Sequence, residues 1–114
     1  MNKRKIGNLG EDQAIKFLEV LGYKILERNF YSRSGEIDII AQDNSIIVFV
    51  EVKYRTNSSF GSAIESISTK KIIRICKTAK FYLKSKNDFE ARFDVISINK
   101  DQIEHIVNAF DFVE

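Results

Sequence analysis

The segment from Ile46 to Tyr54 constrains the fold of this chain more than any other part of the sequence. It reads Ile-Ile-Val-Phe-Val-Glu-Val-Lys-Tyr, and its β-branched and aromatic residues predict a strand. Side chains of a strand alternate between its two faces, so Glu51 and Lys53 share one face, roughly 7 Å apart. The rest of that face is apolar. Two charged residues at the end of such a strand are not explained by core packing, and they mark a candidate functional site.

The other segments alternate between helical and extended patterns. Helices are predicted from about Leu9 to Leu21 and from Thr69 to Lys84, and further strands at Tyr23–Tyr31, Glu36–Ala41, Arg92–Ile98 and Ile103–Phe112. The polar stretch from Thr56 to Gly61 predicts a mobile loop. A length of 114 residues suits one domain, 1–114. This order predicts an α/β domain with a central mixed sheet flanked by helices.

The composition excludes several kinds of site. Cys76 is the single cysteine and His105 the single histidine, so an internal disulfide, a cysteine zinc site and a His/Cys zinc cluster are excluded. A metal would have to be held mainly by carboxylates, which suits Mg²⁺ or Mn²⁺.

The N-terminus is basic, but no apolar run follows it, and no stretch is long enough to span a bilayer. We therefore expect a cytoplasmic protein with no membrane partner.

A second acid is predicted to lie near Glu51. If Asp43 and Asn44 form a two-residue hairpin loop, Asp38 faces Phe49 and Glu36 faces Glu51. Asp38 is then diagonal to Glu51, roughly 5–8 Å away. An odd number of loop residues would place the two acids on opposite faces.

Carboxylates this close repel each other unless one holds a proton or a cation lies between them. A divalent metal would resolve the repulsion, activate a water and neutralise a phosphate. Lys53 could then bind the phosphate or orient the water. Glu11 lies in line with the apolar stripe of its helix, where an acid is costly unless compensated, and it could reach the same cluster as a third catalytic and metal-binding acid.

Each of these residues also has a plainer interpretation. Glu51 and Lys53 could form an ion pair on a solvated face, and Asp38 could be a surface acid near a turn. Glu36 is better interpreted as an exposed hairpin residue. Glu11 could be an acid favoured by the helix dipole.

The segment from Ser66 to Lys86 holds seven basic residues and no acidic one. A helix with one basic side is an electrostatic footprint for phosphates, which makes Lys70, Arg74 and Lys77 candidates for nucleic-acid binding. A solvated amphipathic helix is the alternative. Further basic residues that could flank the acidic site are Arg33, Arg55 and the run from Lys3 to Lys5.

Three other residues have mainly structural interpretations. Cys76 is expected in the core, and His105 on the surface of a strand. Asp94 is expected to be a buried partner of Arg92 or of another basic residue.

The order of these motifs resembles a known family. Gly35-Glu36-Ile37-Asp38-Ile39-Ile40 followed by Phe49-Val50-Glu51-Val52-Lys53 resembles the PD-(D/E)XK nuclease motif, with Ile37 where the motif has proline. More closely, the chain resembles the small uncharacterised bacterial YraN-like family, itself similar to archaeal Holliday-junction resolvases. The resemblance extends from Gly7-Asn8-Leu9-Gly10-Glu11 through Asn29-Phe30 to Arg92-Phe93-Asp94-Val95 and Asn108-Ala109-Phe110.

The resemblance implies a restriction-endonuclease-like fold, with Mg²⁺ (or Mn²⁺) bound by Asp38 and Glu51, Lys53 catalytic and Glu11 supporting. It implies an endonuclease that hydrolyses phosphodiester bonds in nucleic acid, with branched or damaged DNA among the candidate substrates, and by analogy a homodimer. A catalytically inactive nucleic-acid-binding protein with the same fold is the alternative. A structural protein with an acidic ion-pair network is the third hypothesis.

Overall fold

The computed structural model describes residues 3–55, 64–86, 89–100 and 102–113, with the backbone alone in residues 3–9. Two helices and five strands follow one another as α1 (Lys3–Val20), β1 (Lys24–Ser32), β2 (Gly35–Asp43), β3 (Ile46–Arg55), α2 (Thr69–Leu83), β4 (Glu90–Asn99) and β5 (Gln102–Phe110). The predicted order of elements is confirmed. The predicted loop from Thr56 to Gly61 lies outside the described residues.

The five strands form one sheet in the order β1-β2-β3-β4-β5. Strands β3 and β4 are parallel, and every other neighbouring pair is antiparallel. The segment between β3 and β4 contains α2, as a parallel pair requires a crossover. The predicted α/β class with a mixed sheet is therefore confirmed, and the arrangement is compatible with a restriction-endonuclease-like fold.

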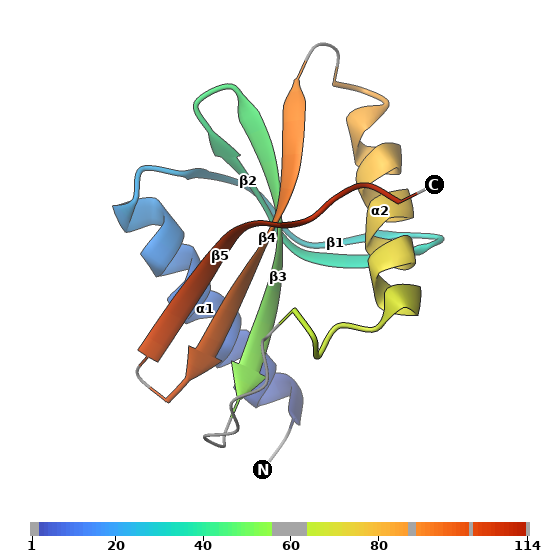
Figure 1. Cartoon of the computed structure of the whole chain (residues 1–114). Coiled ribbons are helices and arrows are strands. Elements are labelled where there is room, and N and C mark those ends of the chain that lie inside the picture. Colours follow the sequence, from blue (N-terminus) through green and yellow to red (C-terminus); the bar gives the residue numbers. More distant parts are fainter. Residues whose placement is uncertain (1–2, 56–63, 87–88, 101, 114) are drawn as a thin grey trace.

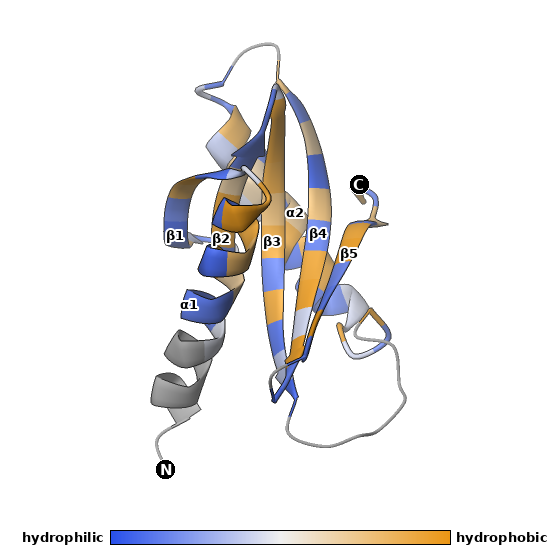
Figure 2. Cartoon of the chain, turned by 90° about the vertical axis from the view of Figure 1, so that its left-hand side faces the viewer, coloured by the Kyte–Doolittle hydropathy of each residue, from blue (hydrophilic) through white to orange (hydrophobic). Residues whose placement is uncertain are grey.

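The two helices cover opposite faces of the sheet (Figures 1 and 2). Helix α1 contacts β1, β2 and β3, and α2 contacts β1 and β2. No helix in the described part of the chain is long and apolar enough to cross a membrane.

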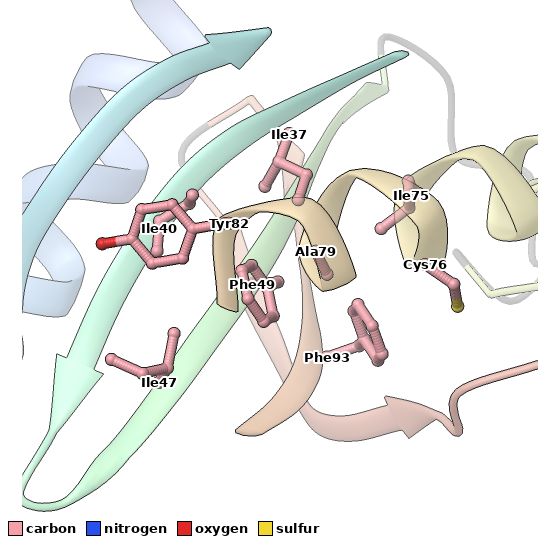
Figure 3. Packing of buried hydrophobic residues seen from close by; sticks show 9 residues of the cluster. All are labelled: Ile37, Ile40, Ile47, Phe49, Ile75, Cys76, Ala79, Tyr82 and Phe93. Carbon is pink, nitrogen blue, oxygen red and sulfur yellow. The ribbon is translucent and has the colours of Figure 1, made fainter. Parts of the chain in front are cut away.

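Each face of the sheet has its own apolar core. Under α2, the buried side chains shown in Figure 3 come from β2, β3, β4 and the helix: Ile37, Ile40, Ile47, Phe49, Ile75, Cys76, Ala79, Tyr82 and Phe93. Under α1, the buried cluster comprises Ala14, Leu18, Ile39, Ala41, Val48, Val50, Ile96 and Ile98. The prediction that Cys76 belongs to the core is confirmed.

Strand β3 changes character along its length, as the hydropathy colours of Figure 2 show. Its first half is apolar on both faces, because both helices cover it. Polar residues enter only in its second half, where Glu51 and Lys53 fall on the face that α2 covers. On the face that α2 covers, a polar site can therefore form at the end of β3.

The β2–β3 hairpin differs in register from the prediction. Asp43 pairs with Ile46, and the pairing continues to Ile39 opposite Val50. This pairing leaves Asn44 and Ser45 as the two loop residues. Asn44 has the left-handed conformation (φ 56°) that a tight hairpin turn requires. The predicted pairing of Asp38 with Phe49 was wrong by two residues. The loop still has an even number of residues, so Asp38 and Glu51 share a face as predicted.

Candidate functional site

Asp38 and Glu51 lie side by side where the β2–β3 pairing ends. The Val52 backbone N–H donates to Asp38 Oδ2 at 2.8 Å, and the Asp38 carboxyl also hydrogen-bonds to the Glu51 carboxyl. Glu51 is only 6% exposed, and Asp38 is half-buried. The two acids therefore interact directly across the β2–β3 pair.

These two acids form part of the wall of a cavity of about 360 Å³. Its lining comes from the start of β2, the second half of β3 and the N-terminal half of α2: Gly35, Glu36, Asp38, Glu51, Ser68, Lys71, Arg74 and Ile75. Glu36 is half-buried, so its interpretation as an exposed hairpin residue was wrong. One side of the cavity is acidic, and the helix contributes two cations on the other.

The electrostatics of the cavity favour a proton or a cation near Asp38. Burial and the neighbouring Glu51 carboxylate raise the pKa of Asp38 to about 7. Burial, and then the charges of Asp38 and Glu11, raise the pKa of Glu36. The acids therefore act on one another across short distances, which is costly for a site that holds only carboxylates.

Lys71 is a residue of this site that the sequence analysis did not assign to it. Its Nζ lies 3.0 Å from Glu51 Oε1. Burial lowers the pKa of the Lys71 ammonium, but Glu51, Asp38 and Glu36 together outweigh burial and raise it. A signal was present in the sequence, because Lys71 precedes the buried Ile75 and Ala79 at intervals of four residues and thus belongs to the core-facing stripe of α2.

Glu11 approaches the same acids from α1. Its carboxylate, 12% exposed, lies 3.4 Å from Arg28 Nε on β1, while Arg28 Nη1 lies 2.6 Å from Asp12. Burial and the charge of Asp38 raise the pKa of Glu11, and Arg28 partly offsets them. Glu11 is thus close enough to Asp38 to feel its charge, but it does not line the cavity.

Lys53 is half-buried on β3, opposite Ser97 of β4. It shares a face with Glu51, as strand alternation requires. Its place is beyond the lining of the cavity, nearer the end of the strand.

The turn between β1 and β2 fits closely against α2 and so fixes the cavity wall. Gly35 has φ +154°, and a Cβ at this position would lie 3.4 Å from Arg74 Cβ. Ser32 Oγ lies 2.9 Å from Thr78 Oγ1, and Thr78 donates to the Arg74 carbonyl. Glycine suits position 35 because φ +154° is a backbone conformation that residues with a side chain rarely adopt.

The predicted nucleic-acid-binding residues come from several elements, and among them Arg74 lines the cavity. Lys70, Arg74 and Lys77 are exposed on α2. Arg33 is exposed in the turn between β1 and β2, and Arg55 is half-buried at the end of β3. The side chains of Lys3 to Lys5 lie outside the described residues.

A second polar cluster surrounds Asp94 on the α1 face of the sheet. Asp94 is fully buried, and it accepts hydrogen bonds from Arg92 Nε (3.0 Å) and the Asn108 backbone N–H (3.0 Å). His105 Nε2 lies 2.8 Å from Asp94 Oδ2, and Arg92 also donates to the Tyr23 hydroxyl. The predicted burial of Asp94 against Arg92 is confirmed. The prediction of His105 as a surface residue was wrong, because its side chain is 9% exposed and bonded to Asp94.

The acidic pair has the donor chemistry of a magnesium site. Among the described residues, no three or more His, Cys, Asp or Glu side chains are arranged to hold a metal ion. Mg²⁺ is commonly held by only one or two carboxylates together with water and substrate phosphates. Asp38 is half-buried and Glu51 nearly buried, and their repulsion raises the pKa of Asp38, so this pair of carboxylates fits such an ion.

The chain matches a protein-family model and many proteins of similar sequence. A model of the uncharacterised protein family UPF0102 matches residues 10–98. The chain belongs to this family. A UPF0102 protein of Persephonella marina is 54% identical over 92% of this chain and 92% of its own length. Relatives in Sulfurihydrogenibium sp. and Fusobacterium nucleatum are 48% and 46% identical, over 96% and 95% of this chain and 97% and 92% of their own lengths.

The predicted YraN-like membership is thereby confirmed. The matched region contains Glu11, Asp38, Glu51 and Lys53. The family description assigns no activity.

Proposed function

We propose that this UPF0102 protein is a metal-dependent endonuclease that hydrolyses phosphodiester bonds in nucleic acid, with DNA as the first substrate to test. The observation that carries the proposal is the direct contact of Asp38 with the nearly buried Glu51, beside a helix that carries cations and no acids in its first turn. The carboxylates can bind a divalent cation, and the basic residues of α2 can bind a phosphate. Metal-assisted phosphodiester hydrolysis uses both kinds of group.

In this proposal Asp38 and Glu51 hold Mg²⁺ or Mn²⁺, and Glu11 tunes Asp38 through its charge. When bound, the divalent cation supplies positive charge against the phosphate and makes a nearby water more acidic. The hydrogen bond from Val52 holds the Asp38 carboxylate in place. Lys53, farther along the same face, orients the attacking water or binds the phosphate, and Arg74 binds a flanking phosphate.

The proposal extends to a cytoplasmic protein that acts as a homodimer, since cleavage of both strands of branched or damaged DNA requires two sites. An inactive protein that binds nucleic acid with the same residues is the alternative.

Cleavage of a panel of labelled substrates tests the proposal. The panel holds single-stranded, duplex and four-way-junction DNA together with RNA, incubated with Mg²⁺, Mn²⁺ or EDTA. We expect metal-dependent cleavage that Asp38→Asn and Glu51→Gln each abolish. Glu104→Gln, which changes an exposed acid on β5, is the matched control and should retain full activity. Binding without cleavage by the wild type would establish the inactive alternative.

A further inference from the structure

The Lys71 ammonium lies beside the acids of the cavity. It comes from α2, whereas Asp38 and Glu51 come from β2 and β3. Its Nζ lies 3.0 Å from Glu51 Oε1, and its charge also acts on Asp38 and Glu36. One cation therefore faces three acids.

The position of Lys71 in its helix is unfavourable by itself. The helix begins with the N-cap Ser68, whose Oγ accepts from the Lys71 backbone N–H at 3.1 Å, and its first turn contains no acid. The N-terminus of a helix carries partial positive charge and favours acids over lysines in its first turn. The ion pair with Glu51 is what offsets this cost.

Lys71 already supplies a positive charge to the acidic pair. Within the described part of the chain, no buried side-chain nitrogen or oxygen lacks a hydrogen-bond partner. The Lys71 side chain is 44% exposed, so its long flexible stem can carry the ammonium away from Glu51 toward solvent. A cavity of about 360 Å³ leaves room for a hydrated cation in its place.

We infer that Lys71 is the resident counter-ion of the acidic pair and that a divalent cation must displace its ammonium from Glu51 to bind. This inference rests on the proposed function, because it concerns the same metal site. It follows from charge and space: two cations cannot share Glu51 at contact distance without strong repulsion. Lys71 is thus a positioning residue that sets how tightly the site binds metal.

Metal binding by the whole protein gives the first test. Mn²⁺ binding is measured by titration calorimetry for wild type, Lys71→Met and Lys80→Met. Lys80 is an exposed lysine of the same helix that lies outside the cavity, so its loss controls for net charge. We expect Lys71→Met to bind Mn²⁺ about threefold more tightly or better, the equivalent of one partly exposed ion pair, and Lys80→Met to match the wild type.

The second test uses the wild type and needs no variant. Acetylation of each lysine by acetic anhydride is followed by mass spectrometry with Mg²⁺ and with EDTA. Displacement predicts that Mg²⁺ increases the modification rate of Lys71 while that of Lys80 stays unchanged.

The outcomes separate this inference from the proposed function. Binding of Mn²⁺ by wild type and Lys71→Met with equal affinity, or an unchanged Lys71 modification rate in metal-loaded protein, would overturn the inference and leave the metal site standing. Failure of both wild type and Lys71→Met to bind Mn²⁺ would overturn the metal site and the inference together. The inference is established if Lys71→Met, but not Lys80→Met, binds Mn²⁺ more tightly than the wild type and if Mg²⁺ speeds the acetylation of Lys71 in the wild type.

Discussion

The Asp38 side chain accepts the backbone N–H of Val52 at 2.8 Å, across from its own strand. The backbone pairing of β2 with β3 ends at Ile39 and Val50. Beyond that pair, the Asp38 carboxylate accepts the Val52 N–H in place of a backbone carbonyl. This bond holds Asp38 against Glu51 although the two acids repel each other. The backbone of β3 therefore holds the Asp38 carboxylate in place, while the repulsion between Asp38 and Glu51 destabilises the folded state.

The first prediction concerns the stability of the metal-free protein against pH. The folded pKa of Asp38, about 7, is raised above its usual value, so the folded state binds more protons than the unfolded chain between about pH 4 and 7. The protonated Asp38 carboxyl stabilises the folded state fully below the pKa that Asp38 has in the unfolded chain, and this stabilisation is lost as the pH rises through about 7. We expect the free energy of unfolding in urea with EDTA to fall by on the order of 2 kcal/mol between pH 5 and 8.

Asp38→Asn removes the charge while leaving an oxygen to accept from Val52. This variant should lose most of that pH dependence and be more stable than the wild type at pH 8. Glu104→Gln should keep the wild-type slope. An equally steep slope in Asp38→Asn would assign the effect to other groups.

The second prediction separates the roles of Glu11 and Asp38. Glu11 contacts Arg28 and acts on Asp38 only through its charge, so it is expected to support the site from outside. Glu11→Gln should reduce metal-dependent cleavage roughly tenfold, as changes outside the direct ligands do, whereas Asp38→Asn should abolish it. Initial cleavage rates at saturating Mg²⁺ make this comparison. Equal losses in the two variants would make Glu11 a direct ligand.

The third prediction concerns the buried cluster around Asp94. Asp94→Ala leaves Arg92 without its buried partner and also removes the bonds to His105 and the Asn108 N–H. We expect the free energy of unfolding to fall by about 3 kcal/mol or more. Asp111→Ala, at an exposed acid after β5, should change it by less than about 0.5 kcal/mol. Urea unfolding at pH 7 measures both.

The same cluster should respond to acid. Burial acts to raise the pKa of Asp94, but the hydrogen bonds with His105, Arg92 and the Asn108 N–H, together with the Arg92 charge, outweigh burial and lower it. Its stabilising effect is therefore present above the usual carboxyl pKa and is lost as the pH falls below about 4. A wild-type protein whose unfolding free energy did not change more than that of Asp94→Ala below pH 4 would contradict this assignment.

The elements and the shared face of the acids could be predicted because both depend on local periodicity. An even loop of two residues is enough to put Asp38 and Glu51 on one face, whichever two residues form it. The register needed more than local pattern. Asp43 stays in the strand, where its carboxylate lies 3.4 Å from Arg92 Nη1 on β4, and Asn44 supplies the left-handed turn residue instead. Such a partner, 49 residues away, is not visible in a hairpin motif.

The residues that sequence analysis misassigned are defined by packing between distant elements. His105 alternates along β5 like a surface residue, yet it contacts the rings of Phe17 on α1 and Tyr23 and bonds to Asp94. Lys71 lies in a run of basic residues and was assigned to no site from the sequence. Its pairing with Glu51 depends on how α2 crosses the sheet, and helix periodicity alone does not give the crossing.

The fourth prediction tests whether the basic side of α2 binds a nucleic-acid backbone. Arg74 and Lys77 are exposed on this helix. If each contacts a phosphate, Arg74→Gln and Lys77→Gln should each lower the slope of log affinity against log salt concentration by about one. Lys16→Gln changes an exposed lysine on α1, which covers the opposite face, and should leave the slope unchanged. Fluorescence anisotropy with labelled DNA in EDTA measures binding without cleavage. Equal slopes in all four proteins would remove α2 from the interface, because counterion release reports the phosphates that a protein neutralises.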